Sequence, residues 1–289
     1  MEQYMKQIKQ DHHYKLNNGV SIPAVGFGTW QTPDGCMAVS AVKTALCGGY
    51  SHIDTAAVYG NEESVGRGVR ESQADRSDLF VTGKLWNTER GYDKTIAAFE
   101  KTLQDLDTDY LDLYLIHWPA SPSQYPNWRE INSETWRALE TLYDQGKVRA
   151  IGVSNFGVSH LEALLEDCRI RPMVNQIEVH PGQNQTEIVD FCRDHDILVE
   201  AWSPLGTGRM LANPVLNEIG EAHDKSAAQV CIRWLLQRGI LPLPKSVTPH
   251  RIAENIDVFD FELTDEDMNR INEIPYFGGS GLDPDKVDF

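Results

Sequence analysis

The sequence predicts a (β/α)8 TIM barrel, a fold of the α/β class, from the number, spacing and composition of its apolar runs. Eight short runs rich in apolar and β-branched residues recur along the 289 residues, and their starts lie 25 to 43 residues apart. That spacing leaves room for a helix between consecutive runs. Several runs are apolar at successive positions, which is typical of parallel strands covered on both faces. Eight strands close around a filled interior, so we expect a closed barrel.

Each of the eight predicted strands precedes helical or loop sequence. The strands are expected over Val25–Trp30, Tyr50–Ala56, Leu79–Leu85, Leu111–Trp118, Val148–Ser154, Met173–Val179, Leu198–Leu205 and Leu241–Ser246. Helix signals follow at Asn61–Ser64, Thr95–Phe99 and Ser133–Leu139. Ser226 and Gln229 have the spacing of a capping box. These signals support one helix after each strand.

The remaining segments complete one predicted domain over residues 1–289. Residues 1–13 are polar and expected to be flexible, and 14–22 alternate around Asn-Gly, which predicts a hairpin capping the barrel bottom. Residues 206–224 are interpreted as a loop insertion. The Gly-, Pro- and Asp-rich tail, 275–289, is also expected to be a loop, and its shortness indicates an open pocket.

Composition narrows the class of partner. With 26 Lys plus Arg against 43 Asp plus Glu, the net charge is −17, which disfavours binding to nucleic acids and anionic membranes. No run approaches the roughly 18 apolar residues of a membrane span. The five cysteines are scattered without a C-x-x-C spacing, so we expect reduced thiols and no zinc site. The prediction is a cytoplasmic protein that acts on a small molecule.

Four ionisable side chains are predicted to meet at the mouth of the barrel. Asp54, Lys84 and His117 end the second, third and fourth predicted strands, and Tyr59 follows the second. Taken singly, each is commonly a cap, a surface ion-pair partner or a packing residue. The carboxyl ends of barrel strands carry the chemistry in such folds, so the four together predict an active site.

The four residue types form a proton donor with its supporting groups. A phenol has a reference pKa of about 10, so Tyr59 needs a neighbouring cation to act near neutrality, and Lys84 provides one. Asp54 supplies the counter-charge that keeps Lys84 an ammonium ion. His117 adds a hydrogen-bond donor. This set fits a general acid aimed at a carbonyl oxygen that gains negative charge.

Four stretches resemble the aldo-keto reductase family, and the likeness runs along nearly the whole chain. They are Gly49–Glu62, Lys84–Trp86, Asp112–Pro119 and Leu243–Thr248. The likeness is strongest to small bacterial members, among them 2,5-diketo-gluconate reductases and methylglyoxal or glyoxal reductases. By this resemblance Tyr59 is the general acid, Asp54 and Lys84 tune it, His117 orients the carbonyl, and C4 of a reduced nicotinamide gives the hydride.

The cofactor end is predicted from a local reversal of charge. Gly26-Phe27-Gly28 lacks the third glycine of a Rossmann fingerprint. The run from Lys245 to Arg251 instead has two cations and no acid. Thr248 as N-cap and Pro249 as the first helical residue would begin a helix whose N-terminus faces an anion. A phosphate is the expected occupant.

The resemblance implies a monomer whose cofactor is NADPH, and it assigns several groups of residues to that cofactor. Lys245, Ser246 and Arg251 match positions at the 2′-phosphate, and Glu254 and Asn255 match positions near the adenine. The other expected contacts are Ser154, Asn155 and Gln176 at the carboxamide, Trp202 on the ring, Ser203, Leu205 and Gly206 at the pyrophosphate, and Thr29, Trp30, Val247 and Thr248 beside them.

Tryptophans follow three of the predicted strands and indicate an apolar substrate wall. Trp30, Trp86 and Trp118 are expected to line the pocket with His117, and the loop 119–128 to close its rim. The resemblance to the small bacterial members implies reduction of small aldehydes and α-dicarbonyls, and of keto-sugars as a further class.

Three alternatives remain open at this point. Tyr143 and Lys147 fit the Tyr-x-x-x-Lys pattern of short-chain dehydrogenases, but no Gly-rich dinucleotide loop precedes them. A metal-dependent barrel hydrolase could use His52, Asp54, His117 and His180 as ligands, although Lys84 would oppose a dication. A non-catalytic NADP(H)-binding protein on the same barrel is the third alternative.

Overall fold

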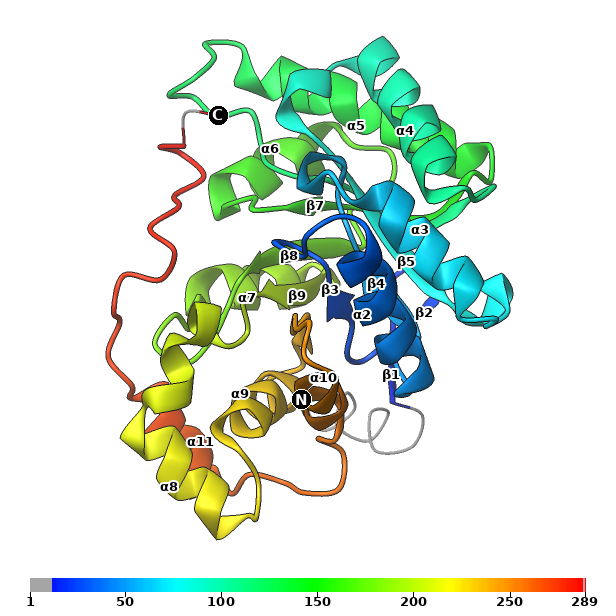
Figure 1. The fold of residues 1–289 in the computed structure, drawn as a ribbon. Helices are drawn as coiled ribbons and strands as arrows, with labels where there is room; N and C mark the ends of the chain where they lie inside the picture. Colours follow the sequence, from blue (N-terminus) through cyan, green and yellow to red (C-terminus); the bar gives the residue numbers. More distant parts are fainter. Residues whose placement is uncertain (1–11, 288) are drawn as a thin grey trace.

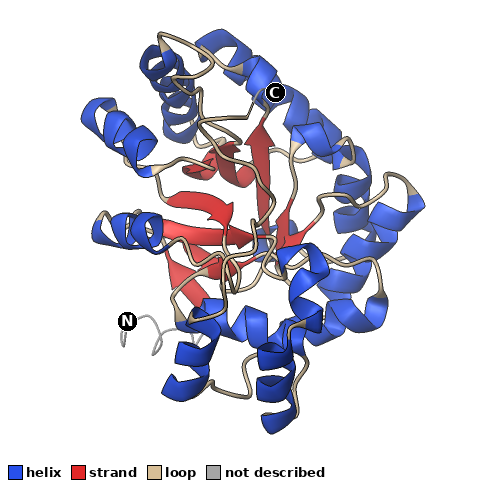
Figure 2. Cartoon of the chain, turned by 90° about the vertical axis from the view of Figure 1, so that its left-hand side faces the viewer, coloured by secondary structure: helices blue, strands red, loops and turns tan. Residues whose placement is uncertain are grey.

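A parallel sheet of eight strands, taken in chain order, forms the centre of the computed structural model, which describes residues 12–287 and 289. Figure 2 shows the helices arranged around these strands. The strands are β3 (Phe27–Gly28), β4 (His52–Asp54), β5 (Phe80–Leu85), β6 (Leu111–Ile116), β7 (Val148–Ser154), β8 (Val174–Glu178), β9 (Leu198–Trp202) and β10 (Leu241–Pro242). Each lies inside its predicted range, so the (β/α)8 prediction is confirmed.

Helices follow the strands and cover the outside of the barrel (Figure 1). They are α2 (Cys36–Cys47), α3 (Glu62–Glu71), α4 (Tyr92–Leu106), α5 (Trp128–Asp144), α6 (Val158–Asp167), α7 (Thr186–Asp194), α8 (Pro214–Ala222), α9 (Ala227–Gln237), α10 (Pro249–Ile256) and α11 (Asp265–Asn272). Short 3-10 helices are η1 (Ala57–Tyr59), η2 (Arg76–Asp78), η3 (Asn87–Glu89) and η4 (Gly206–Ala212). Among the residues described, no helix has the length and apolarity to cross a membrane.

Helix α8 corrects one prediction, because residues 206–224 were expected to be a loop. The Asn213 side chain accepts hydrogen bonds from the backbone of Val215 and Leu216, and Pro214 occupies the first helical position. An Asn cap followed by Pro is a strong helix start that the sequence reading overlooked. The capping box at Ser226 and Gln229 is present as predicted, with both reciprocal bonds.

A hairpin closes the bottom of the barrel. Strand β1 (His13–Lys15) pairs antiparallel with β2 (Ser21–Pro23), one residue longer at each end than predicted. The expected flexibility of 1–13 is wrong for its last two residues, since His13 is in the hairpin and the carbonyl of His12 accepts a bond from Ala24. Residues 1–11 lie outside the described part of the chain.

The barrel closes where the first strand meets the last. The amide of Gly26 donates to the Pro242 carbonyl at 3.0 Å, and that of Gly28 to the Pro244 carbonyl at 3.1 Å. Proline has no N–H, so neither proline can return a hydrogen bond. A Cβ on Gly28 would lie 3.2 Å from the Leu243 carbonyl oxygen, and glycine therefore permits the close approach. The two backbone hydrogen bonds of this seam therefore both run from the first strand to the last.

The tail after α11 is irregular, as predicted, and it reaches the pocket. In Figure 1 it passes from α11 along the outside of the molecule to the C-terminus beside α5 and α6. The Ser280 amide and hydroxyl bond the Glu178 carboxylate at 2.9 and 2.6 Å. Further on, Leu282 and Phe289 line the pocket. The tail is thus anchored at β8 and reaches the aromatic wall, and the openness of the pocket stays a prediction.

Candidate active site

Lys84 is the centre of the predicted quartet. Its Nζ donates to Asp54 Oδ1 at 2.6 Å, to the Thr55 carbonyl at 2.9 Å and to Tyr59 Oη at 3.3 Å. The ring of Tyr59 meets that of His117 edge-on, with centroids 5.7 Å apart. Adjacent parallel strands supply Asp54, Lys84 and His117, so their ends bring the four side chains together.

A short turn held by hydrogen bonds positions Tyr59 after β4. The chain makes the 3-10 helix η1 and turns at Gly60, whose φ of 66° is in the left-handed region that favours glycine. Asn61 then donates from its side chain to the carbonyls of Thr29 and Thr32 at 3.1 and 3.0 Å. These two bonds fix the turn against the loop after β3. The turn in turn fixes the position of the Tyr59 backbone.

Burial and neighbouring charges together set the charge states of Lys84, Tyr59 and His117. Burial alone would lower the pKa of Lys84, but Asp54 and Tyr59 oppose it and the net shift is upward, so the ammonium form is kept. Burial raises the pKa of Tyr59, and the opposite effect of Lys84 is smaller. Burial, with Lys84 nearby, lowers the pKa of His117 well below its usual range. Near neutrality the site holds a phenol, an ammonium and a neutral imidazole.

Glu200 is a buried residue at the site that sequence reasoning missed. Gln176 Nε2 donates to Asp54 Oδ2 at 2.9 Å and also to Glu200 Oε2 at 2.7 Å. Glu200 is fully buried on β9, two residues before Trp202. An acidic residue in phase with a pocket tryptophan on an otherwise apolar strand was the signal that could have revealed it.

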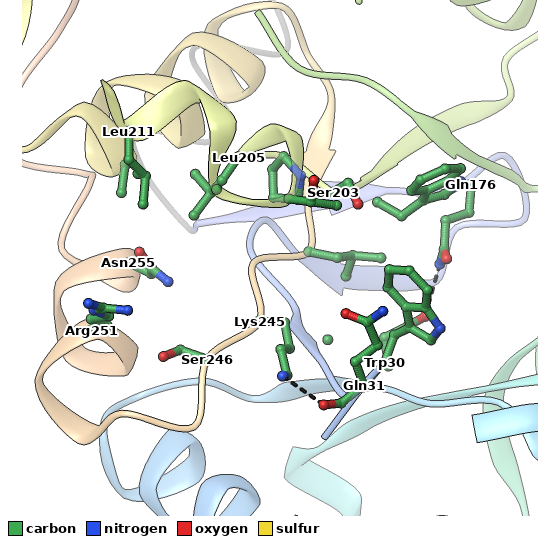
Figure 3. A pocket seen from close by; sticks show the side chains of 18 of the residues that line it. Trp30, Gln31, Gln176, Ser203, Leu205, Leu211, Lys245, Ser246, Arg251 and Asn255 are labelled. Carbon is green, nitrogen blue, oxygen red and sulfur yellow. Dashed lines mark hydrogen bonds between the residues drawn. The ribbon is translucent and has the colours of Figure 1, made fainter. Parts of the chain in front are cut away.

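An elongated pocket of about 800 Å³ runs from the quartet toward α10. In Figure 3, Trp30 and Gln176 lie at one end, and Arg251 and Asn255 at the other. The predicted site residues on its lining are Trp30, Asp54, Tyr59, Trp86, His117, Trp118, Ser154, Asn155, Gln176, Trp202, Ser203, Leu205, Lys245, Ser246, Arg251, Glu254 and Asn255. Five predicted residues are not among the lining residues: Thr29, Lys84, Gly206, Val247 and Thr248.

The middle of the pocket is a network of amides and hydroxyls. Ser154 Oγ donates to the Gln176 carbonyl at 2.8 Å, and Asn155 Nδ2 donates to the His117 carbonyl at 2.9 Å. Trp202 Nε1 donates to Asn155 Oδ1 at 2.8 Å. Asn155 has a left-handed φ of 60°. These bonds fix the orientation of each polar group that faces the pocket.

The far end of the pocket carries the predicted cations. Helix α10 begins at Pro249 with Thr248 at the N-cap position, as predicted, although the Thr248 side chain makes no capping bond. Ser246 Oγ instead accepts from the Thr248 amide at 3.1 Å. Lys245 Nζ donates to the Gln31 carbonyl at 3.0 Å across the seam (Figure 3). Arg251 and the start of α10 thus lie at this end, and Figure 3 shows Lys245 between Arg251 and Gln31.

Aromatic rings form the wall beside the quartet. Trp86 stacks on Phe289 with centroids 5.6 Å apart, and Trp118 meets Phe289 edge-on at 5.3 Å. Phe289 was not predicted, because its approach depends on the path of the tail. The loop 119–128 does not line the pocket as expected. It holds the tail instead, through a bond from Gln124 to the Val287 carbonyl at 2.7 Å.

Residues on which the metal-dependent hydrolase and the short-chain dehydrogenase alternatives depend have other partners in the structure. His52 Nε2 pairs with Thr82 Oγ1 at 2.9 Å, whereas His180 Nδ1 pairs with the Pro181 carbonyl at 2.9 Å. Within residues 12–287 and 289, no group of three or more potential ligands could hold a metal ion. Of the Tyr-x-x-x-Lys pair, Lys147 forms an ion pair with Glu100 outside the pocket.

Comparison with known proteins decides the family. The model described as "Aldo/keto reductase family" matches residues 24–275. The chain belongs to the aldo/keto reductase family. It is therefore an oxidoreductase, and the resemblance found in the sequence is confirmed.

This aldo/keto reductase has close relatives of known name and structure. It is 52% identical over 275 residues to the glyoxal reductase of Bacillus subtilis (strain 168), covering 95% of this chain and 97% of the relative. The crystal structure of MGS-M4, an aldo-keto reductase from a Medee basin deep-sea metagenome library, is 46% identical with a TM-score of 0.89, covering 96% of this chain and all of that one. A Bombyx mori aldo-keto reductase in complex with NADP is 38% identical with a TM-score of 0.84, covering 91% and 92%.

Proposed function

We propose that this reductase uses NADPH to reduce small aldehydes and α-dicarbonyls, and with them some keto-sugars, to alcohols, with Tyr59 as the general acid. One observation carries the proposal. The buried Lys84 ammonium bonds both Asp54 and Tyr59 at the end of a pocket that also holds Lys245 and Arg251. A proton donor at one end and an anion site at the other fit a carbonyl substrate and a phosphorylated cofactor.

The pocket fits NADPH by length, charge and polar groups. Lys245, Ser246 and Arg251 would bind the 2′-phosphate, with Val247 and Thr248 supporting the start of α10. The other contacts would be Glu254 and Asn255 at the adenine, Ser203, Leu205 and Gly206 at the pyrophosphate, Trp202 at the ring, Ser154, Asn155 and Gln176 at the carboxamide, and Thr29 and Trp30 beside them. When bound, NADPH supplies a hydride to the carbonyl carbon. The NADP complex of the Bombyx mori relative supports this assignment.

The chain's own residues supply one proton to the carbonyl oxygen. His117, neutral, donates a hydrogen bond that orients the carbonyl oxygen. As that oxygen gains charge, the O–H bond of Tyr59 breaks and the alcohol O–H bond forms. Lys84 stabilises the phenolate left behind, and Asp54 keeps Lys84 charged while it does so. The raised pKa of Tyr59 keeps its proton in place until the carbonyl oxygen can accept it.

The substrate end favours small carbonyl compounds with apolar or aromatic groups. Trp30, Trp86, Trp118 and Phe289 line it, and Val58 lies beside Tyr59. Apolar rings favour compact or aromatic aldehydes and diketones. The name of the 52%-identical relative, a glyoxal reductase, supports the dicarbonyl class.

The test is the loss of NADPH absorbance with purified protein and a panel of methylglyoxal, phenylglyoxal, nitrobenzaldehyde and 2,5-diketogluconate, run beside NADH. We expect turnover of several carbonyls with NADPH preferred. NADPH binding without turnover of any carbonyl would favour the non-catalytic alternative. The cytoplasmic location and the monomeric state stay predictions from the sequence.

A further inference from the structure

Glu200 is a buried acid that the proposed mechanism does not use. Its exposed fraction is 0%, and its Oε1 has no hydrogen-bond partner among the described residues. Its Oε2 accepts from Gln176 Nε2 at 2.7 Å, while Asp54 Oδ2 accepts from the same nitrogen at 2.9 Å. A primary amide nitrogen has two hydrogens. Both hydrogens of the Gln176 amide are therefore held by carboxyl groups behind the pocket.

This arrangement fixes which atom of Gln176 faces a ligand. With Nε2 held by Asp54 and Glu200, the amide oxygen is left to accept a hydrogen bond from the pocket side. The reversed amide would place its oxygen against Asp54 Oδ2, and the Asp54 carboxylate, which is paired with the Lys84 ammonium, has no hydrogen to donate. Asp54 alone holds one hydrogen and leaves the other free. Glu200 supplies the second restraint on the amide.

We propose that Glu200 is a positioning residue: it holds the Gln176 amide so that its oxygen accepts from the nicotinamide carboxamide, and its charge state sets the preference between oxidised and reduced cofactor. The inference rests on the proposed function, because it needs Gln176 to lie at the nicotinamide. It adds a fifth side chain, on β9, to the ionisable groups of the site.

The surroundings of Glu200 explain why its charge can change near neutrality. The flanking strands place Gln176 and Leu241 beside it, and neither side chain is charged. The charged groups that act on it are Asp54 and Lys84 across the barrel, and Lys84 is already paired with Asp54. Burial first, and then the negative charge of Asp54, raise the pKa of Glu200 to about 8.

The sign of the effect on the cofactor follows from charge alone. Below pH 8 Glu200 is mainly neutral, and above it a negative charge appears behind the pocket floor. The oxidised nicotinamide ring is positive and the reduced ring is neutral, so the new charge favours NADP+ over NADPH. Of the neighbouring acid-base groups, the pKa of Tyr59 is raised from 10 and that of His117 lies well below 6.5, so neither titrates in this range.

The experiment measures the dissociation constants of NADPH and NADP+ from pH 6.5 to 9.5 through quenching of tryptophan fluorescence. It compares the wild type with Glu200→Gln, which keeps an acceptor for Gln176 but cannot ionise, and with Glu200→Leu, which removes the acceptor. Glu140→Gln is the matched control, because Glu140 is also buried but its carboxylate accepts from the Arg169 and Ile170 amides on the outside of the barrel.

In the wild type we expect the ratio of the NADP+ constant to the NADPH constant to fall as the pH rises through about 8. Titration of the 2′-phosphate or of a surface group cancels in this ratio, since both cofactors carry the same phosphate. The ratio should be flat in Glu200→Gln and unchanged from the wild type in the control. Glu200→Leu should weaken both cofactors about fivefold, the usual effect of losing one neutral hydrogen bond.

Two results would overturn the proposal, and they are distinguishable from failure of the proposed function. An equal slope in the wild type and Glu200→Gln would show that another group sets the preference. Unweakened binding in a folded Glu200→Leu would show that Gln176 needs no second restraint. If the wild type bound neither cofactor, the proposed function would fall, and this inference with it.

Discussion

Removing one partner of the buried Asp54–Lys84 pair should cost more stability than removing both. The atoms lie 2.6 Å apart and Lys84 is fully buried. In Lys84→Met the unpaired Asp54 carboxylate can be neutralised by taking up a proton. At pH 7 this protonation costs about 4 kcal/mol for an ordinary carboxyl pKa of about 3.9. In Asp54→Asn the lone ammonium can lose a proton at a cost of about 5 kcal/mol from a pKa of about 10.4. These costs are upper limits for the free energy of unfolding that the two single variants lose. They match the usual 3–5 kcal/mol for a buried charge left without its partner.

The double variant Asp54→Asn/Lys84→Met holds no charge at this point, so we expect it to lose about 2 kcal/mol or less. The assay is urea unfolding of all four proteins, followed by circular dichroism. The deficit of Lys84→Met should also shrink by about 1.4 kcal/mol per pH unit from pH 7 toward 4, because the folded variant binds the proton more tightly than its unfolded chain. Single losses that simply add in the double variant would refute the reasoning.

Three further predictions concern the proton donor, the anion site and the helix packing. Tyr59→Phe should lower turnover by about 10²- to 10⁴-fold with little change in NADPH affinity, since its hydroxyl bonds Lys84. Lys245→Ala and Arg251→Ala should each weaken NADPH about tenfold or more and leave NADH nearly unchanged, as measured by equilibrium binding. Gly66→Ala should cost about 2–3 kcal/mol in unfolding free energy, because its Cβ would lie 2.1 Å from the Leu106 carbonyl oxygen.

Each of these predictions has a result that would contradict it. Wild-type turnover by Tyr59→Phe would remove Tyr59 from the mechanism. Equal losses for NADPH and NADH would refute the phosphate assignment of Lys245 and Arg251. Glu63→Ala, on the exposed side of the same helix as Gly66, should change stability by about 0.5 kcal/mol or less. A similar cost for both helix variants would contradict the packing argument.

Strand order and the catalytic geometry could be predicted because they depend on local patterns. Apolar runs repeat at a βα spacing, and the ends of neighbouring parallel strands must lie together, so Asp54, Lys84 and His117 were placed by strand order alone. Tyr59 follows from its distance past β4, since a short turn cannot carry it far. The fold therefore fixes these positions before any side chain is packed.

Contacts between distant segments could not be predicted in the same way. Phe289 meets Trp86 only because Ser280 and Gln124 anchor the tail along its path, and no local pattern encodes that path. The phase of Glu200 with Trp202 could have placed it on the pocket side of β9, but its contact with Gln176 depends on the pairing of β8 with β9. Its partner Gln176 was found, yet the direction of the amide depends on two carboxyl groups from other strands.

The seam between the first and last strands is expected to couple ligand binding to closure of the barrel. Pro242 and Pro244 accept from Gly26 and Gly28 but give nothing back, so this junction has half the hydrogen bonds of a full parallel ladder. Lys245 sits on one side of it and reaches Gln31 on the other. A dinucleotide that contacts both sides must stabilise the closed form, by about 2.7 kcal/mol at one hundred times its dissociation constant. We therefore expect the amide hydrogens of Gly26 and Gly28 to exchange with solvent more slowly when the cofactor is bound.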